Sequence, residues 1–79
     1  MAELVWTPDS GPSRTYVLNP GRNTVGRGPH NDVDIDHESV SNPHCEIVVT
    51  AKGILVQDLG SAHGTWVGPT RIDATFLGP

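Results

Sequence analysis

The sequence predicts an all-β domain, a β-sandwich built from two antiparallel sheets. Nine glycines and seven prolines recur over 79 residues, too often for any uninterrupted window of ten or more residues to give a convincing helical pattern. Short runs of β-branched and aromatic residues recur instead, separated by turn residues. We count seven or eight such runs, at a spacing of roughly eight to twelve residues, which is typical of a sandwich.

Each predicted strand is bounded by residues that favour turns. The first run, ELVW, is followed by TPDSGPS, and the second, RTYVL, is closed by NPG. In CEIVVT, Cys45, Ile47 and Val49 on one face alternate with Glu46, Val48 and Thr50 on the other. The AKG that follows is short enough for a hairpin. The predicted strands cover residues 3–6, 14–18, 22–26, 33–36, 45–50, 53–59, 65–68 and 71–77.

The length, net charge and cysteine content of the chain limit the kinds of protein that it can be. A chain of 79 residues predicts one domain, here 1–79, with a small core. The formal net charge is −4 and the five basic residues are scattered, which disfavours nucleic acid as a partner. No membrane span or signal peptide is recognisable. With Cys45 as the single cysteine, these features favour a cytoplasmic protein and exclude an internal disulfide framework.

Three predicted loops carry unusual chemistry: residues 26–32, 36–44 and 60–65. They are rich in Gly, Ser, Asn and His, and loops at one end of a sandwich commonly carry function. If they meet, they offer the cation of Arg27, the hydroxyls of Ser39 and Ser41, and the amide of Asn42. Such a set suits an oxyanion such as phosphate, because arginine presents a planar fork of donors.

The motifs Gly26-Arg27, Ser41-Asn42-Pro43-His44 and DLGSAHGT at 58–65 occur in one order along the chain. Together they resemble the forkhead-associated (FHA) domain, and in particular its bacterial-type members. The resemblance implies an eleven-stranded β-sandwich that is a binding module and not an enzyme, without metal or cofactor. Its partner would be a protein or peptide carrying phosphothreonine, made by an upstream Ser/Thr kinase.

The resemblance also implies roles for individual residues. Arg27 and Ser41 would hold the phosphate and Asn42 would assist, while His63 and the backbone N–H of Ala62 would contact the peptide. A second set would keep the loops in place: Gly26, His44, Ser61, Gly64 and Thr65.

This sequence departs from the family pattern at three places. His63 stands where the family usually has asparagine, and an imidazole can partly mimic that amide as donor and acceptor. Ala62 lacks a hydroxyl that some members have. The chain ends at FLGP, which predicts a domain truncated at its C-terminal strand. A sheet edge left open there could pair with a second copy, giving a homodimer.

Other interpretations stay open beside this one. An FHA-type scaffold could bind a partner without phosphate, and an Arg27 guanidinium locked to an acidic side chain would favour that alternative. Zinc binding by histidines is disfavoured because no short ligand spacing is present. A hydrolase using Ser41 and His63 lacks a nucleophile-elbow motif. Adjacent strand residues point to opposite faces, which disfavours a Cys45–His44 nucleophile pair.

Overall fold

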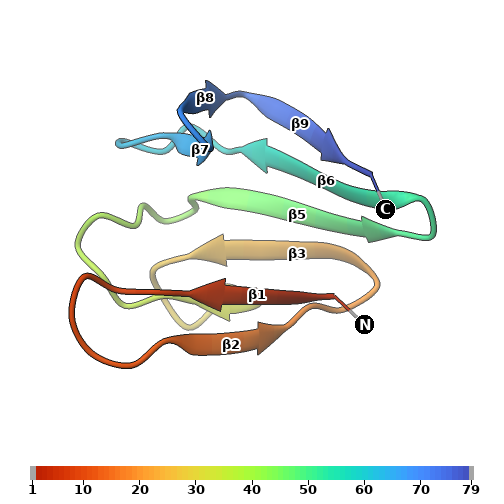
Figure 1. The fold of residues 1–79 in the computed structure, drawn as a ribbon. Coiled ribbons are helices and arrows are strands. Elements are labelled where there is room, and N and C mark those ends of the chain that lie inside the picture. Colours follow the sequence, from red (N-terminus) through yellow and green to blue (C-terminus); the bar gives the residue numbers. More distant parts are fainter. Residues whose placement is uncertain (1, 79) are drawn as a thin grey trace.

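The computed structural model describes residues 2–78, which form strands, turns and loops (Figure 1). Residues 2–78 contain no helix that could cross a membrane. The described residues form nine strands: β1 (Glu3–Trp6), β2 (Arg14–Val17), β3 (Gly21–Gly26), β4 (Val33–Asp34), β5 (Cys45–Thr50), β6 (Gly53–Asp58), β7 (Thr65–Val67), β8 (Thr70–Ile72) and β9 (Ala74–Leu77).

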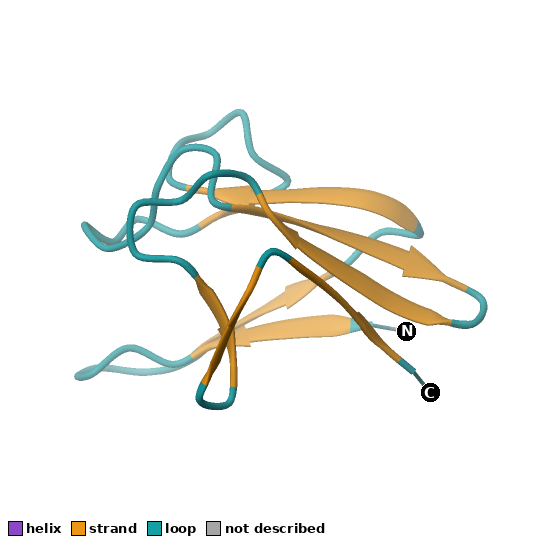
Figure 2. Cartoon of the chain, turned by 90° about the horizontal axis from the view of Figure 1, so that it is seen from above, coloured by secondary structure: helices purple, strands orange, loops and turns teal. Residues whose placement is uncertain are grey.

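The strands are arranged in two layers. One layer is a five-stranded sheet in the order β4-β3-β5-β6-β9. The other consists of two separate hairpins, β1-β2 and β7-β8, which lie on the same side of that sheet (Figure 2). The sandwich predicted from the sequence is therefore present, with a second layer divided into two parts. An apolar cavity of about 400 Å³ lies between the layers and is lined from both hairpins.

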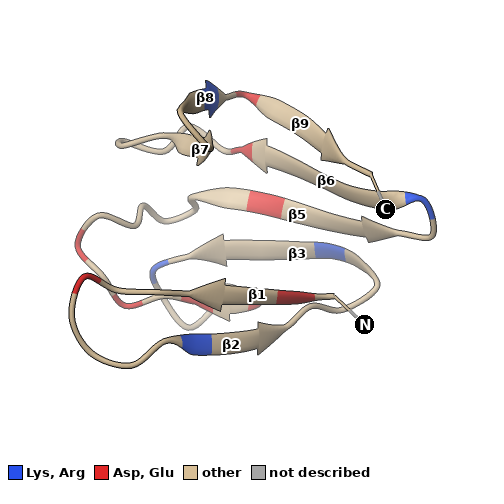
Figure 3. Ribbon diagram, viewed as in Figure 1, with Lys and Arg blue, Asp and Glu red and all other residues tan. Residues whose placement is uncertain are grey.

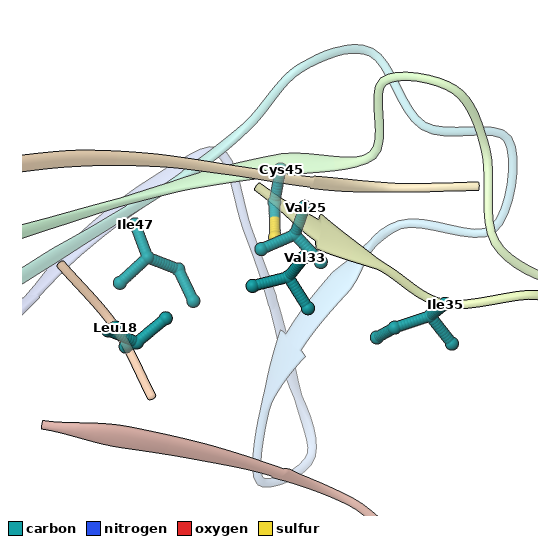
Figure 4. Close-up of a cluster of buried hydrophobic side chains, with 6 residues drawn as sticks. All are labelled: Leu18, Val25, Val33, Ile35, Cys45 and Ile47. Carbon is teal, nitrogen blue, oxygen red and sulfur yellow. The ribbon is translucent and has the colours of Figure 1, made fainter. Parts of the chain in front are cut away.

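The core lies between the five-stranded sheet and the β1-β2 hairpin. In β5, Cys45 and Ile47 are buried on the inner face, and Ile47 pairs with Val56 of β6. Because strand side chains alternate between faces, Cys45 and Ile47 are buried while Glu46 and Val48 are only partly covered. Figure 4 shows the buried side chains together; they are Leu18, Val25, Val33, Ile35, Cys45 and Ile47.

The segment 71–77, predicted as one strand, is two strands that belong to different layers. β8 pairs with β7, whereas β9 pairs with β6. The break falls at Asp73, whose backbone carbonyl accepts a hydrogen bond of 2.8 Å from the N–H of Asp58. Since one strand cannot pair in both layers, the chain bends at Asp73 to cross between them.

The segment 33–36 also differs from its prediction. β4 comprises only Val33 and Asp34, and it runs parallel to β3, with Val25 opposite Val33. The loop 27–32 doubles back at Gly28, whose φ of 135° is open to glycine. This return buries Val33 beside Val25, so burial of an apolar side chain accounts for the parallel pairing.

Four loops gather at one end of the molecule, at the left of Figure 1. Strands β3 and β6 end there and β5 begins there, so the loops 27–32, 35–44 and 59–64 meet at this end. The loop 7–13 between β1 and β2 lies at the same end. The fold therefore brings together the three loops that the sequence singles out.

Candidate functional site

His44 ties the three loops together. Its Nδ1 accepts a hydrogen bond of 3.1 Å from the backbone N–H of Ser41, so this nitrogen carries no proton. Nε2 must then carry the proton, and it donates to the carbonyl of Gly64 at 2.9 Å. The backbone of His44 adds bonds to Val25 and Leu59. One half-buried residue thus holds the ends of β3, the second loop and the third loop together.

Ser41 lies where the second loop touches the other two. Its Oγ accepts a hydrogen bond of 2.9 Å from the N–H of Ala62, and its carbonyl accepts one of 3.1 Å from the N–H of Arg27. The N–H of Ala62 is therefore occupied within the protein. The hydroxyl proton of Ser41 is left to be donated outwards, because the Oγ is an acceptor in this contact.

Arg27 follows directly after β3, and its side chain is exposed. Among residues 2–78 the ion pair is that of Arg22 with Glu46, at the far end of β3. No acidic side chain of this described part holds the Arg27 guanidinium. Its fork of donors is available at the loop end, next to Ser41.

Asn42 is held by the first loop. Its Oδ1 accepts from the ring of His30 at 2.8 Å and from the amide of Asn31 at 3.1 Å. Within residues 2–78 its own NH₂ group has no acceptor, so it can donate to a ligand. Asn31 is buried over Gly26: a Cβ at Gly26 would lie 2.8 Å from the Asn31 Oδ1. Any larger residue at 26 would displace Asn31 and with it Asn42.

Asp58 shapes the third loop. Its Oδ2 accepts from the N–H groups of Gly60 and Ser61, at 3.1 and 3.2 Å. Its Oδ1 accepts from the hydroxyls of Ser61 and Thr65, at 2.5 and 2.8 Å. These bonds, first of all that from the Ser61 hydroxyl, lower the pKa of Asp58 below its ordinary value. The carboxylate therefore acts as a charged template on which residues 60–65 fold.

His63 is exposed at the tip of this loop. Its carbonyl accepts a hydrogen bond of 3.0 Å from the indole N–H of Trp66, which fixes the backbone. The hydrogen bonds recorded among residues 2–78 leave the imidazole ring itself unengaged. The ring can therefore turn to meet a ligand, and Trp66 is itself 56% exposed.

Cys45, the single cysteine, is buried. Burial raises the pKa of the Cys45 thiol to about 11, so at neutral pH it is a protonated, buried side chain. Residues 2–78 contain no cluster of three His, Cys, Asp or Glu side chains that could hold a metal ion.

Sequence reasoning assigned no role to three residues that the structure places at the loops. His30 supports Asn42, Asp58 organises the third loop, and Arg71 packs against Gly64. The role of Asp58 could have been predicted from the sequence, because an Asp side chain commonly accepts a hydrogen bond from the backbone N–H two residues later, as in an Asx turn. Arg71 carried no such signal, because its place depends on the pairing of β8 with β7.

The comparisons with known proteins agree with this arrangement. The model of the FHA domain family matches residues 23–78, and the chain belongs to that family. The Mediator of DNA damage checkpoint protein 1 of Rattus norvegicus is 40% identical over 65 residues, covering 78% of this chain. FhaA of Mycobacterium tuberculosis is 39% identical over 59 residues, covering 75% of this chain. This chain spans 5% and 11% of those two relatives, respectively.

Solved structures resemble this one closely. A chain studied for phosphothreonine-dependent FHA domain interactions superposes with a TM-score of 0.80 at 34% identity, covering 89% of this chain and 73% of that one. The FHA domain of FhaA, complexed with the intracellular domain of Rv3910, gives 0.79 at 34% identity, covering 89% and 77%. EmbR of Mycobacterium tuberculosis, in complex with a low-affinity phosphopeptide, gives 0.75 at 35%, covering 82% and 17%.

Proposed function

We propose that this domain binds phosphothreonine-containing segments of partner proteins through the loop end of the sandwich. Arg27 and Ser41 hold the phosphate and the NH₂ group of Asn42 assists. His63 and the third loop contact the peptide backbone. The domain acts as a binding module in phosphorylation-dependent signalling, without a catalytic step. A Ser/Thr kinase must act before it, because the ligand is a phosphorylated threonine.

The unpaired guanidinium of Arg27 carries this proposal. The phosphate-independent alternative is favoured by an Arg27 locked to an acidic side chain, and no such pair is recorded among residues 2–78. Arg22, by contrast, is engaged by Glu46, and this contact raises the pKa of Arg22 further. The backbone N–H of Arg27 donates to the carbonyl of Ser41, so Arg27 is adjacent to the loop that carries the Ser41 hydroxyl and the Asn42 amide. Together these donors match an oxyanion.

The solved relatives support the ligand class. One was studied for phosphothreonine-dependent interactions, and the structure of another is a complex with a low-affinity phosphopeptide. The identities of about 34–35% extend over most of this chain.

Titration with a phosphothreonine peptide and its unphosphorylated counterpart tests the proposal. The phosphopeptide should bind and the other should not, because the phosphate carries a charge of about −1.5 to −2. Losing one partner of a hydrogen-bonded charge pair costs about 2–5 kcal/mol, so Arg27→Gln should weaken binding at least roughly thirtyfold. Ser41→Ala and Asn42→Ala should each weaken it by about tenfold or more.

Arg22→Gln is the matched control, because it removes the same charge at the far end of β3. It should leave the affinity for the phosphopeptide unchanged. Equal binding of the two peptides by the unmodified protein would overturn the proposal. So would full affinity in a folded Arg27→Gln protein.

A further inference from the structure

We propose that Arg71 is a second cation of the binding site, which selects an anionic side chain near the phosphothreonine on the same peptide. The anion is a carboxylate or a second phosphate. This inference rests on the proposed function and concerns the choice among phosphothreonine ligands.

Arg71 is held directly against the third loop. A Cβ built on Gly64 would lie 2.5 Å from the Nε of Arg71 and 3.0 Å from its Cζ. The start of the guanidinium group therefore lies over the Cα of Gly64, where no side chain separates the two. Gly64 has a φ of 87°, which also favours glycine at this position.

The β7-β8 hairpin orients this arginine. Arg71 pairs across the strands with Trp66, so the two side chains lie on the same face of the hairpin. The indole N–H of Trp66 donates to the carbonyl of His63, and the carbonyl of Gly64 accepts from His44. Trp66, the neighbour of Arg71, and Gly64, which Arg71 contacts, are therefore both held by hydrogen bonds at the third loop, whose Ala62 contacts Ser41.

The charge of Arg71 is not neutralised within the described residues. Its side chain is exposed, and the ion pair found among residues 2–78 is that of Arg22 with Glu46. In Figure 3 the basic segment on β8 contains Arg71, and a second basic segment follows β3 at the loop end. An anionic ligand would find two separate cations, Arg27 in the loop after β3 and Arg71 on β8 against the third loop.

The chain geometry limits how far Arg71 lies from the phosphate. The N–H of Ala62 contacts the Ser41 hydroxyl, and Gly64 is two residues further on. An extended chain advances at most about 3.3–3.6 Å per residue, so two residues span at most about 7 Å between Cα atoms. Arg71 is therefore within reach of a peptide side chain about two to four residues from the phosphothreonine.

The experiment measures selectivity rather than absolute affinity. Phosphothreonine peptides carrying alanine, glutamate or phosphoserine at the flanking positions, on either side, are titrated at low salt. Exposed ion pairs contribute about 0.2–1 kcal/mol, so one anionic flank should improve binding by up to about fivefold over alanine. Arg71→Gln should bring this ratio close to one, whereas Arg71→Lys should retain most of it and Arg22→Gln should retain all of it.

The outcomes separate the two proposals. A gain with glutamate assigns a carboxylate to Arg71, and a gain with phosphoserine alone assigns a second phosphate. No gain in the unmodified protein, or a gain that survives in Arg71→Gln, overturns the role of Arg71 while the proposed function stands. If the alanine-flanked phosphopeptide does not bind better than its unphosphorylated form, the proposed function itself fails.

Discussion

Replacing Asp58 with alanine should destabilise the domain and loosen the third loop. Four donors converge on this carboxylate: two backbone N–H groups and the hydroxyls of Ser61 and Thr65. Alanine leaves all four without their acceptor. Gly60 is exposed and can turn to water, but Ser61 is only 6% exposed and cannot do so without opening the loop.

The magnitude follows from the two bonds of Ser61. A hydrogen bond to a charged group contributes about 1.5–3 kcal/mol, so the loss is at least about 3 kcal/mol. A domain of this size has a free energy of unfolding of only about 4–12 kcal/mol. At about 4–8 °C for each kcal/mol, the melting temperature should fall by roughly 12–24 °C.

Asp58→Asn separates hydrogen bonding from charge. The amide oxygen can accept from both backbone N–H groups, while the NH₂ group can donate to the two hydroxyls. We therefore expect Asp58→Asn to lower the free energy of unfolding by less than half as much as Asp58→Ala does. The reason is that Asp58→Asn keeps the hydrogen bonds and removes only the charge that strengthens them.

The pH dependence gives a second readout. The pKa of Asp58 is lowered in the folded state, so its stabilisation is complete above the ordinary carboxyl pKa. That stabilisation is lost as the pH falls from about 5 through the lowered value. Asp58→Asn should lose less stability over this range. Asp32, whose pKa is lowered by hydrogen bonds from Thr24, titrates in both proteins and cancels in the comparison.

Thermal unfolding followed by circular dichroism and calorimetry, at pH 7 and at steps down to pH 3, provides both measurements. A melting temperature of Asp58→Ala within about 3 °C of the unmodified protein would refute the reasoning. So would identical acid profiles of the unmodified protein and Asp58→Asn.

The remaining predictions concern the loop tip and the open edge of the sheet. His63→Ala should weaken phosphopeptide binding by about fivefold to tenfold, the loss of one hydrogen bond, whereas His63→Asn should retain it, because an amide also donates and accepts. Equal affinity of all three proteins in calorimetric titration would show that the ring makes no contact. β9 is an outer strand with Phe76 and Leu77 53% and 42% exposed, so residues 1–79 should pair with a second copy or melt at low temperature. Sedimentation should show that Phe76→Lys shifts this chain toward monomer, and a thermally stable monomer before the substitution would contradict the expectation.

Much of the fold followed from local patterns. The alternation in CEIVVT and the short AKG turn predicted two adjacent antiparallel strands, and β5 and β6 pair from Cys45–Asp58 to Thr50–Gly53. The β5-β6 hairpin could be predicted from the sequence because its two strands and its turn are consecutive in the chain. The FHA resemblance rested on three short motifs, and the family match over residues 23–78 confirms it.

The sequence by itself determined the class of domain, the residues of the loops and the type of ligand that their donors suit. Tertiary structure alone decided the parallel pairing of β4, the crossing between layers at Asp73, and the contact of Arg71 with Gly64. Each depends on residues brought together from different strands or layers, whose positions no periodicity encodes. Local sequence specifies which strands can form, but burial and pairing across the whole domain decide which side chains meet at the loops.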